Sequence, residues 1–190
     1  MPSASETRAR LLAAARRAFA DLGYGKARVE DIVSRAGVGH GTFYAYFPNK
    51  RAALAALIHE NAATLVDLAG QPWRAGDVRA SLLEVLGGLS DLYDRDVDLI
   101  AMWTEASMQD PELGRIRDEV RRQFVARIAR NIERAAGSGL ARPVDPRTAA
   151  TALAAMAEQS MFLRAVRKEP LDRDVLVETL ADLWLHALYR

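Results

Sequence analysis

Apolar residues recur along almost the whole chain at spacings of three and four positions, the period of an amphipathic α-helix. No stretch shows the sustained alternation of apolar and polar residues that indicates a half-buried strand. The sequence therefore predicts an all-α protein of about nine helices. The first should begin after Ser3 and end before Gly23, and the others should cover about 29–36, 40–47, 50–69, 77–93, 97–109, 112–136, 146–167 and 172–189.

The first fifty residues carry clear helix-end signals. Ser3 and Glu6 form a capping-box pattern, Gly23 is expected to end the first helix in a left-handed conformation, and Gly37 is expected to end the second helix. The apolar stripe of the first helix consists of Leu11, Ala14, Ala15, Ala18, Phe19 and Leu22. One long helix followed by two short ones around a glycine turn is the layout of a three-helix unit that ends in a helix-turn-helix.

The segment AGVGHGTFYAYFPNK, residues 36–50, concentrates glycines and aromatic residues. On a helical wheel, Phe43 and Phe47 form one ridge, which should face the core. The opposite arc carries only small residues, namely Gly41, Thr42 and Ala45. Tyr44 and Tyr46 flank that arc, so the helix could approach the major groove of DNA closely. An ordinary core role is the alternative for aromatic residues at this spacing, and it applies to both phenylalanines.

The net charge of +1 hides an asymmetry along the chain. Residues 1–51 carry nine Lys and Arg against four Asp and Glu, whereas residues 52–190 carry 17 against 21. A basic first part beside an acidic remainder favours a polyanion as the partner of the first part. Charge scatter without functional meaning is the alternative at this point.

Several classes of site find no support in the sequence. There is no cysteine, so disulfides and thiolate chemistry are excluded. His40, His59 and His186 match no metal-site spacing, and no catalytic triad or glycine-rich phosphate loop is present. The N-terminus lacks the apolar core of a signal peptide, and no apolar run approaches the roughly 18 residues of a membrane span. We expect a cytoplasmic protein without catalytic activity, cofactor, metal or membrane partner.

Four aspartates lie close together at 91–98, namely Asp91, Asp94, Asp96 and Asp98. They lack the spacing and the glycine of an EF-hand loop. A solvated turn between two helices is therefore favoured over a cation site.

The segment from Gly23 to Lys50 resembles the DNA-binding signature of TetR-type transcriptional regulators. The matching positions are Gly23, Tyr24, Val29, Ile32, Ala36, Gly37, Val38, Gly41, Thr42, Tyr44, Tyr46, Phe47 and Lys50. The resemblance implies a helix-turn-helix DNA-binding domain over residues 1–50 and a helical ligand-binding and dimerisation domain over residues 51–190. The C-terminal sequence itself is not a specific match.

The resemblance also implies roles for single residues. Four match positions that touch the DNA backbone: Thr42, Tyr44, Tyr46 and Lys50. His40 and Gly41 match positions near base edges. The sequence departs from the family at Arg28 and Gly39, where Thr or Ser often caps a helix. Glycine is a fair N-cap, and Arg28 can bind a phosphate directly instead.

The segment 172–189 is apolar almost all round, so a helix there needs two neighbours. One is its own core, and the other is expected to be the same helix of a second copy, with helix 146–167 beside it. A homodimer would place two recognition helices about one DNA turn apart, which suits a palindrome. A last helix buried within a monomer is the alternative. The predicted interface residues are Leu176, Leu180, Leu183, Trp184 and Ala187.

Methionine and aromatic residues in the C-terminal part indicate an adaptable apolar cavity, although an ordinary core is the alternative. Gln159 is polar in an otherwise apolar stretch and could orient a ligand. The predicted ligand-binding residues are Tyr93, Met102, Trp103, Phe124, Met156 and Gln159, with Met108 and Phe162 as further candidates.

These observations predict a homodimeric regulator that binds a palindromic operator in double-stranded DNA. It would most simply be a repressor, released by a small apolar or amphipathic ligand in the C-terminal core and coupled through helix 50–69. A helical ligand-binding or scaffolding protein without specific DNA recognition is the alternative, because Arg28 and Gly39 depart from the family pattern.

Overall fold

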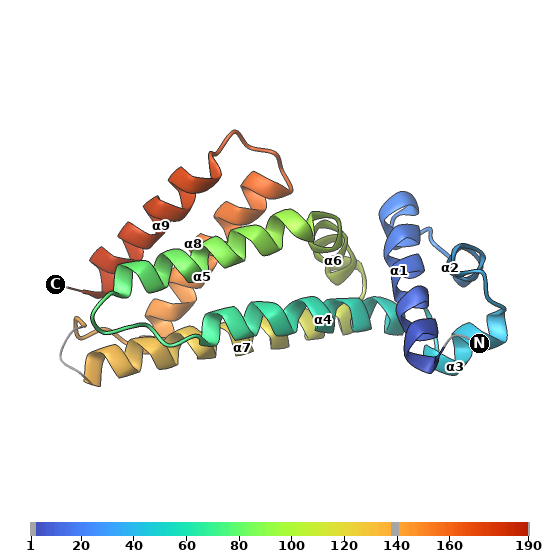
Figure 1. Cartoon of the computed structure of the whole chain (residues 1–190), viewed down its shortest axis with the longest axis horizontal. Coiled ribbons are helices and arrows are strands. Elements are labelled where there is room, and N and C mark those ends of the chain that lie inside the picture. Colours follow the sequence, from blue (N-terminus) through green and yellow to red (C-terminus); the bar gives the residue numbers. More distant parts are fainter. Residues whose placement is uncertain (1–2, 138–140, 190) are drawn as a thin grey trace. The chain divides into compact units, whose positions relative to one another are not determined.

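The computed structural model describes residues 3–137 and 141–189, and these ranges contain nine helices (Figure 1). They are α1 (Ala4–Leu22), α2 (Val29–Ala36), α3 (His40–Tyr46), α4 (Lys50–Gly70), α5 (Val78–Arg95), α6 (Val97–Gln109), α7 (Pro111–Gly137), α8 (Pro146–Ala165) and α9 (Arg173–Leu188). The predicted all-α class is confirmed. The helix ends agree with the sequence signals to within two residues because capping residues set them locally.

The capping box of α1 is present. The Ser3 hydroxyl accepts from the Glu6 amide at 3.1 Å, and the Glu6 carboxylate accepts from the Ser3 amide at 2.6 Å. Gly37 ends α2 in the left-handed conformation, with φ 63° and ψ 42°. Gly23 also has a positive φ of 76°, but its ψ of 148° lies outside the left-handed helical region, so that detail of the prediction is wrong.

The chain folds into two compact units. The first contains the residues up to Ala62 together with Asp98–Arg117, and the second contains Ala63–Val97 together with the residues from Asp118 onward. Helices α4 and α7 therefore contribute residues to both units. The family resemblance implied a DNA-binding domain that ends at residue 50, and this functional boundary stays a prediction. The first compact unit is larger than that domain, because it also includes residues after 50.

The core of the first unit joins the three N-terminal helices to α6. Phe43 and Phe47 are buried, as predicted, in one cluster with Phe19 and Ile32. From α6 and the start of α7, the same cluster takes Leu99, Met102, Ala106 and Leu113. The predicted stripe of α1 is buried except for Leu22, which is exposed near the end of the helix.

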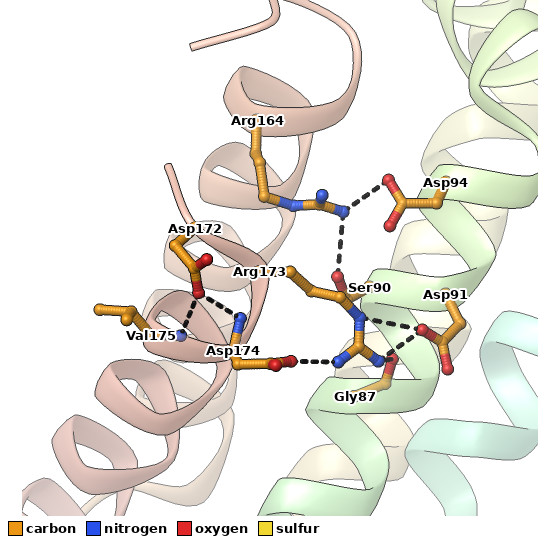
Figure 2. Close-up of polar contacts among 9 residues, drawn as sticks. All are labelled: Gly87, Ser90, Asp91, Asp94, Arg164, Asp172, Arg173, Asp174 and Val175. Carbon is orange, nitrogen blue, oxygen red and sulfur yellow. Dashed lines mark hydrogen bonds and ion pairs between the residues drawn. The ribbon is translucent and has the colours of Figure 1, made fainter. Parts of the chain in front are cut away.

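In the second unit, α5 packs against both α8 and α9 (Figure 1). Two arginines near the loop between α8 and α9 reach acidic residues of α5 (Figure 2). Arg164 donates to Asp94 at 2.7 Å and to Ser90 at 3.0 Å, and Arg173 donates through Nε to Asp91 at 3.1 Å. These charge-assisted bonds hold the α8–α9 hairpin on α5.

The four clustered aspartates are paired rather than simply solvated. Each forms an ion pair with an arginine, and the pairs are Asp91–Arg173, Asp94–Arg164, Asp96–Arg95 and Asp98–Arg16. Asp96 is buried, which corrects the interpretation as a solvated turn. Among the described residues, no group of three or more His, Cys, Asp or Glu side chains could hold a metal ion.

Helix α4 is long and apolar enough to cross a membrane by length and composition alone, which the sequence analysis did not anticipate. Its most apolar window has a mean hydropathy of 1.2, and 44% of that window is buried inside the protein. Core helices of soluble proteins pass the same test. Leu54 and Ile58 of α4 are fully buried, as expected for a core helix.

The ion pair between Arg16 and Asp98 makes the stability of the first unit depend on pH. Arg16 Nε donates to Asp98 Oδ2 at 2.8 Å, and this hydrogen bond together with the charge of Arg16 holds the pKa of Asp98 below its usual value. Because the pKa is lowered in the folded state, the stabilisation is present above the unfolded-state pKa. It is lost as the pH falls through the folded-state pKa.

We therefore expect Asp98→Asn to lower the free energy of unfolding by about 1 kcal/mol at most near neutral pH, because both side chains are partly solvated. The difference from wild type should shrink as the pH is lowered from about 7 to about 3. Urea denaturation across this range measures it. A difference that does not change with pH would contradict the role given to the ion pair.

Candidate nucleic-acid interface

The turn between α2 and α3 is held by local backbone geometry and by one arginine from α1. Gly37 adopts the left-handed conformation, and the Val38 amide donates to the Val33 carbonyl at 3.1 Å. Arg10 Nη2 donates to the Ala36 carbonyl at 2.6 Å, which places a cation at the C-terminus of α2, where the helix dipole favours it. These two bonds fix the end of α2 and the start of the turn that leads to α3.

Helix α3 has one buried and one exposed side. Phe43 points into the core, whereas His40, Gly41 and Tyr44 are exposed. Tyr44 is 55% exposed, and its ring lies edge-on to Phe43 with centroids 5.5 Å apart. Thr42 is half-buried on the same short helix. The predicted surface position of Tyr44 is confirmed.

Tyr46 is less accessible than the sequence predicted. It is half-buried and packs against the hydrophobic cluster of the first unit. Its predicted contact with the DNA backbone stays a prediction, and it would have to use the part of the ring that remains accessible.

The glycines at 39 and 41 are not required by packing within the chain. A Cβ atom built at either position would meet no atom within 4 Å from the other described residues outside its own stretch of backbone. Gly39 has φ −82° and ψ 159°, which any residue adopts, so only Gly37 needs to be glycine for the turn. A glycine that the fold does not need, on the exposed side of α3, favours close approach of another molecule.

His40 lies beside an acidic residue that the sequence analysis missed. His40 Nε2 is 3.4 Å from Glu30 Oε1, and both side chains are more than half exposed. Asp31, not Glu30, caps α2 by accepting from the Arg28 amide at 2.8 Å. A carboxylate on a DNA-facing surface is repelled by phosphates but can accept from the amino group of cytosine. The sequence did hold one signal for Glu30, namely its position in the first turn of α2, close to the turn that leads to His40.

Arg28 precedes α2, and its side chain is exposed and makes no capping hydrogen bond. This agrees with the expectation that arginine would not replace a capping Thr or Ser. Its contact with phosphate stays a prediction.

Lys50 is the predicted DNA contact whose position differs most from expectation. Its Nζ donates to the main-chain carbonyls of Tyr24, Gly25 and Ala27 at 2.8, 3.1 and 2.8 Å. Burial lowers the pKa of Lys50. In this arrangement the three N–H donors of the ammonium group already have three carbonyl acceptors, and the contact of Lys50 with the DNA backbone stays a prediction.

A hollow of about 410 Å³ in the first unit is lined in part by Lys50. Within it, Arg51 Nε is 2.7 Å from Asp110 Oδ2, and the Tyr24 hydroxyl donates to the same oxygen at 3.5 Å. Burial, and then the charge of Asp110, raise the pKa of Tyr24. The lining also includes Gly25, Asn49 and Gln109.

Comparison with known proteins assigns this arrangement to a family. The model of bacterial regulatory proteins of the tetR family matches residues 11–57. The model of the C-terminal domain of the transcriptional regulator EthR matches residues 83–190, more than half of the chain. The chain belongs to the TetR family of transcriptional regulators. It is therefore a DNA-binding, ligand-responsive regulator with a helix-turn-helix.

Relatives of this regulator extend over nearly its whole length. The HTH-type transcriptional regulator EthR of Mycolicibacterium smegmatis is 27% identical over 193 residues, which cover 99% of this chain and 88% of that protein. The structure of GusR from Salmonella enterica superposes with a TM-score of 0.82 at 20% identity and covers 98% of this chain and 97% of its own. The structure of SmeT from Stenotrophomonas maltophilia superposes with a TM-score of 0.80 at 24% identity and covers 96% of this chain and 90% of its own. The two structures show the shared fold.

The dimer-interface residues predicted for the regulator separate into two groups. Leu180 and Trp184 are only 2% exposed and belong to the core of the chain, so the prediction that they face a second copy is corrected. Leu176 is half-buried, whereas Leu183 and Ala187 are exposed. The exposed apolar line of α9 also includes Val175, at 64% exposure, which the sequence analysis missed.

The ligand-binding residues predicted for the regulator belong to two different compact units. Met102 and Trp103 belong to the first unit, whereas Tyr93, Phe124, Met156 and Gln159 belong to the second. Met102 and Phe124 are core residues. Gln159 is exposed on α8, so its predicted role of orienting a ligand inside the core does not fit its position. Met108 is 78% exposed, and Phe162 is half-buried.

A second hollow, of about 150 Å³, lies in the second unit beside Trp73 and Tyr189. Neither hollow is lined by any of the six predicted ligand residues. Of the six, Trp103 retains one signal for a ligand. Its buried indole N–H has no hydrogen-bond acceptor among the described residues.

We expect Gly41→Ala to separate folding from DNA binding. Alanine favours the interior of a helix over glycine by about 0.5–1 kcal/mol, so the free energy of unfolding should rise slightly. DNA affinity should fall by about tenfold or more, because the added methyl group lies on the side that approaches DNA. Thermal denaturation and fluorescence anisotropy with labelled operator measure the two effects.

Gly37→Ala is the matched control. At its positive φ, alanine is strained, so this variant should lose about 1–2 kcal/mol of stability. If Gly41→Ala bound DNA as tightly as wild type, close approach of the backbone at this position would be refuted.

Proposed function

We propose that this regulator is a homodimeric repressor. In this proposal it leaves a palindromic operator when a small apolar or amphipathic ligand binds among its C-terminal helices. The observation that supports this proposal is the exposed side of α3, where His40, Gly41 and Tyr44 are exposed and a Cβ atom built at Gly41 would meet no other described residue within 4 Å. A helix of this shape suits the major groove, with tyrosine and threonine hydroxyls available to phosphate oxygens.

The homodimer rests on exposed apolar surface in α9. Val175, Leu183 and Ala187 are separated by multiples of four residues, so they lie along one side of the helix. The exposed positions of α8 include small residues, among them Thr151, Ala152 and Ala155, which would allow another helix to approach closely. Regulators of this family typically act as dimers, and an isologous contact through these helices would leave two copies of α3 to read two half-sites.

Repression and an apolar effector are supported by relatives with related folds. SmeT is described as the repressor of a multidrug efflux pump, and its complex with triclosan is 25% identical to this chain, with a TM-score of 0.80. FadR of Bacillus halodurans, a fatty acid degradation regulator, superposes over the whole chain with a TM-score of 0.81. The printed descriptions of SmeT and FadR thus both point to apolar or amphipathic small molecules. In this chain, the buried indole N–H of Trp103, which has no acceptor among the described residues, offers such a ligand one polar contact.

Coupling between ligand and DNA is assigned to α4, which begins in the DNA-binding part and continues into the second unit. A coupling free energy of about 1–3 kcal/mol would lower DNA affinity roughly 5- to 150-fold. A regulator of this kind acts on chromosomal DNA, so we place it in the cytoplasm.

Selection of binders from a random pool of duplex DNA tests the core of the proposal. The purified regulator should enrich a palindrome whose half-sites are separated by about one helical turn or a modest multiple, because two α3 helices read it. Enrichment of a single half-site would refute the dimeric mode of binding. No enrichment by folded protein would favour a helical ligand-binding protein without specific DNA recognition.

The dimer surface is tested with Leu183→Asp. Leu183 is 49% exposed, so the charge should be tolerated in the monomer but should disrupt an apolar contact between two copies. We expect a monomer by light scattering and at least about tenfold weaker binding to the palindrome. The matched control is Met108→Asp, which changes an exposed methionine of α6 and should leave the dimer intact. A Leu183→Asp protein that remains dimeric would place the interface elsewhere.

A further inference from the structure

The basic first part of the chain, residues 1–51, contains four acidic residues, namely Glu6, Asp21, Glu30 and Asp31. Three of them hold the helices. Glu6 completes the capping box of α1, and Asp31 caps α2. Asp21 of α1 forms an ion pair with Arg35 of α2 at 2.9 Å. In the described part of the chain, the side chain of Glu30 takes part neither in a cap nor in a bond between α1 and α2, so its presence needs another explanation.

The contact that Glu30 does make is with α3. Its Oε1 lies 3.4 Å from Nε2 of His40, the first residue of that helix. The side chains are 67% and 52% exposed, and a surface pair of this kind contributes little to stability. A carboxylate has acceptor positions on two oxygens, so the contact with His40 leaves capacity for further hydrogen bonds. The pair therefore presents polar groups to another molecule.

The surface around the pair is open and carries groups that suit DNA. Gly39 and Gly41 flank His40, and a Cβ atom built at either would meet no other described residue within 4 Å. Arg28, two residues before Glu30, and Tyr44, one turn after His40, are both exposed. Because phosphates repel a carboxylate, Glu30 lowers DNA affinity at this place unless it accepts a hydrogen bond from the DNA.

Only two bases offer such a bond in the major groove. Cytosine presents its N4 amino group, and adenine presents its N6 amino group next to the acceptor N7. A carboxylate has no donor for that N7, so adenine places two acceptors against each other, whereas cytosine itself presents a donor without an acceptor. Cytosine is therefore the base that an aspartate or glutamate side chain selects.

We propose that Glu30 is a specificity-determining residue, whose carboxylate accepts a hydrogen bond from the N4 amino group of a cytosine while His40 keeps it beside α3. Each half-site of the operator then contains one C·G pair that Glu30 selects. The inference rests on the proposed function, because it specifies one base pair of the operator that the regulator recognises.

The first test compares the sites that variants select from a random pool of duplex DNA. Wild type should select a site with a fixed cytosine, and Glu30→Gln should select the same site with adenine at that position, because glutamine pairs with N6 and N7 of adenine. Glu60→Gln is the matched control. Glu60 is an exposed residue of α4 that accepts from Arg8 at 3.0 Å, so this variant should select the wild-type site. If Glu30→Gln also selected the wild-type site, the inference would be overturned.

The second test measures affinity by fluorescence anisotropy for four operators that differ only in this base pair. Wild type should bind the cytosine operator about 5- to 150-fold more tightly than the other three. Glu30→Gln should lose this preference. If Glu30 served only to stabilise the first turn of α2, or only repelled phosphates, the substitution would change the affinity for all four operators by the same factor. That result would refute a contact with the base.

A third comparison separates a direct contact from an effect through His40. In His40→Ala, Glu30 keeps its place on α2, so a preference for cytosine should remain. Adding Glu30→Gln to His40→Ala should abolish it. If the added substitution had no effect, Glu30 would act only by positioning His40, and the direct contact with cytosine would be excluded.

The selection also separates this inference from the proposed function. If folded wild-type protein enriched no site, sequence-specific recognition would fail and the inference would fail with it. If wild type enriched a site and Glu30→Gln enriched the same site, only the inference would be overturned. Circular dichroism checks that the variants retain their helices, as the exposure of Glu30 and His40 leads us to expect.

Discussion

A helix of seven residues is not stable in water by itself, so everything that α3 does depends on how it is held. Phe43, which is fully buried, supplies the main anchor, and Phe47 continues the same ridge just beyond the helix. Burying a phenylalanine side chain contributes roughly 1.5–3 kcal/mol, which helps to offset the unfavourable formation of so short a helix. The opposite side of α3 can then be small and exposed, because it is not needed for folding.

The same constraint explains why the DNA-binding part is larger than three helices. The core that holds Phe43 also contains Leu99, Met102 and Ala106 of α6. Two ion pairs lie at the ends of α6: Asp98 binds Arg16 of α1, and Asp110, just after α6, binds Arg51 of α4. Helix α6 is therefore part of the compact unit that presents α3, although it lies about fifty residues further along the chain.

In the second unit, ion pairs between arginine and aspartate residues hold α8 and α9 in place on α5. Arg164 and Arg173 fasten the end of α8 and the start of α9 to α5, and Trp184 further along α9 is buried in the core. With its inner side fixed in this way, α9 keeps an outer line of apolar residues that the described part of the chain leaves exposed. A helix that contacts its own core on one side and another apolar surface on the other side needs apolar residues on both sides, and α9 has them.

The sequence by itself determined the features that depend on near neighbours. Helix ends follow from capping residues such as Ser3 and from the left-handed Gly37, and the burial of Phe43 and exposure of Tyr44 follow from the period of one short helix. The matching positions between Gly23 and Lys50 also identified the family, because their spacing lies within one continuous segment. These signals act over a few residues, so they can be read without knowing the fold.

Only the tertiary structure decided the features that depend on distant parts of the chain. Lys50 resembles a surface cation in the sequence, but its acceptors lie 23 to 26 residues earlier and meet it only after α1 has packed. Leu180 and Leu183 look alike in an apolar helix, yet one faces the core and the other solvent, because α9 packs on α5 along one side. Glu30 and His40 become neighbours through the turn at Gly37. In each case the partner is chosen by packing, which local periodicity does not encode.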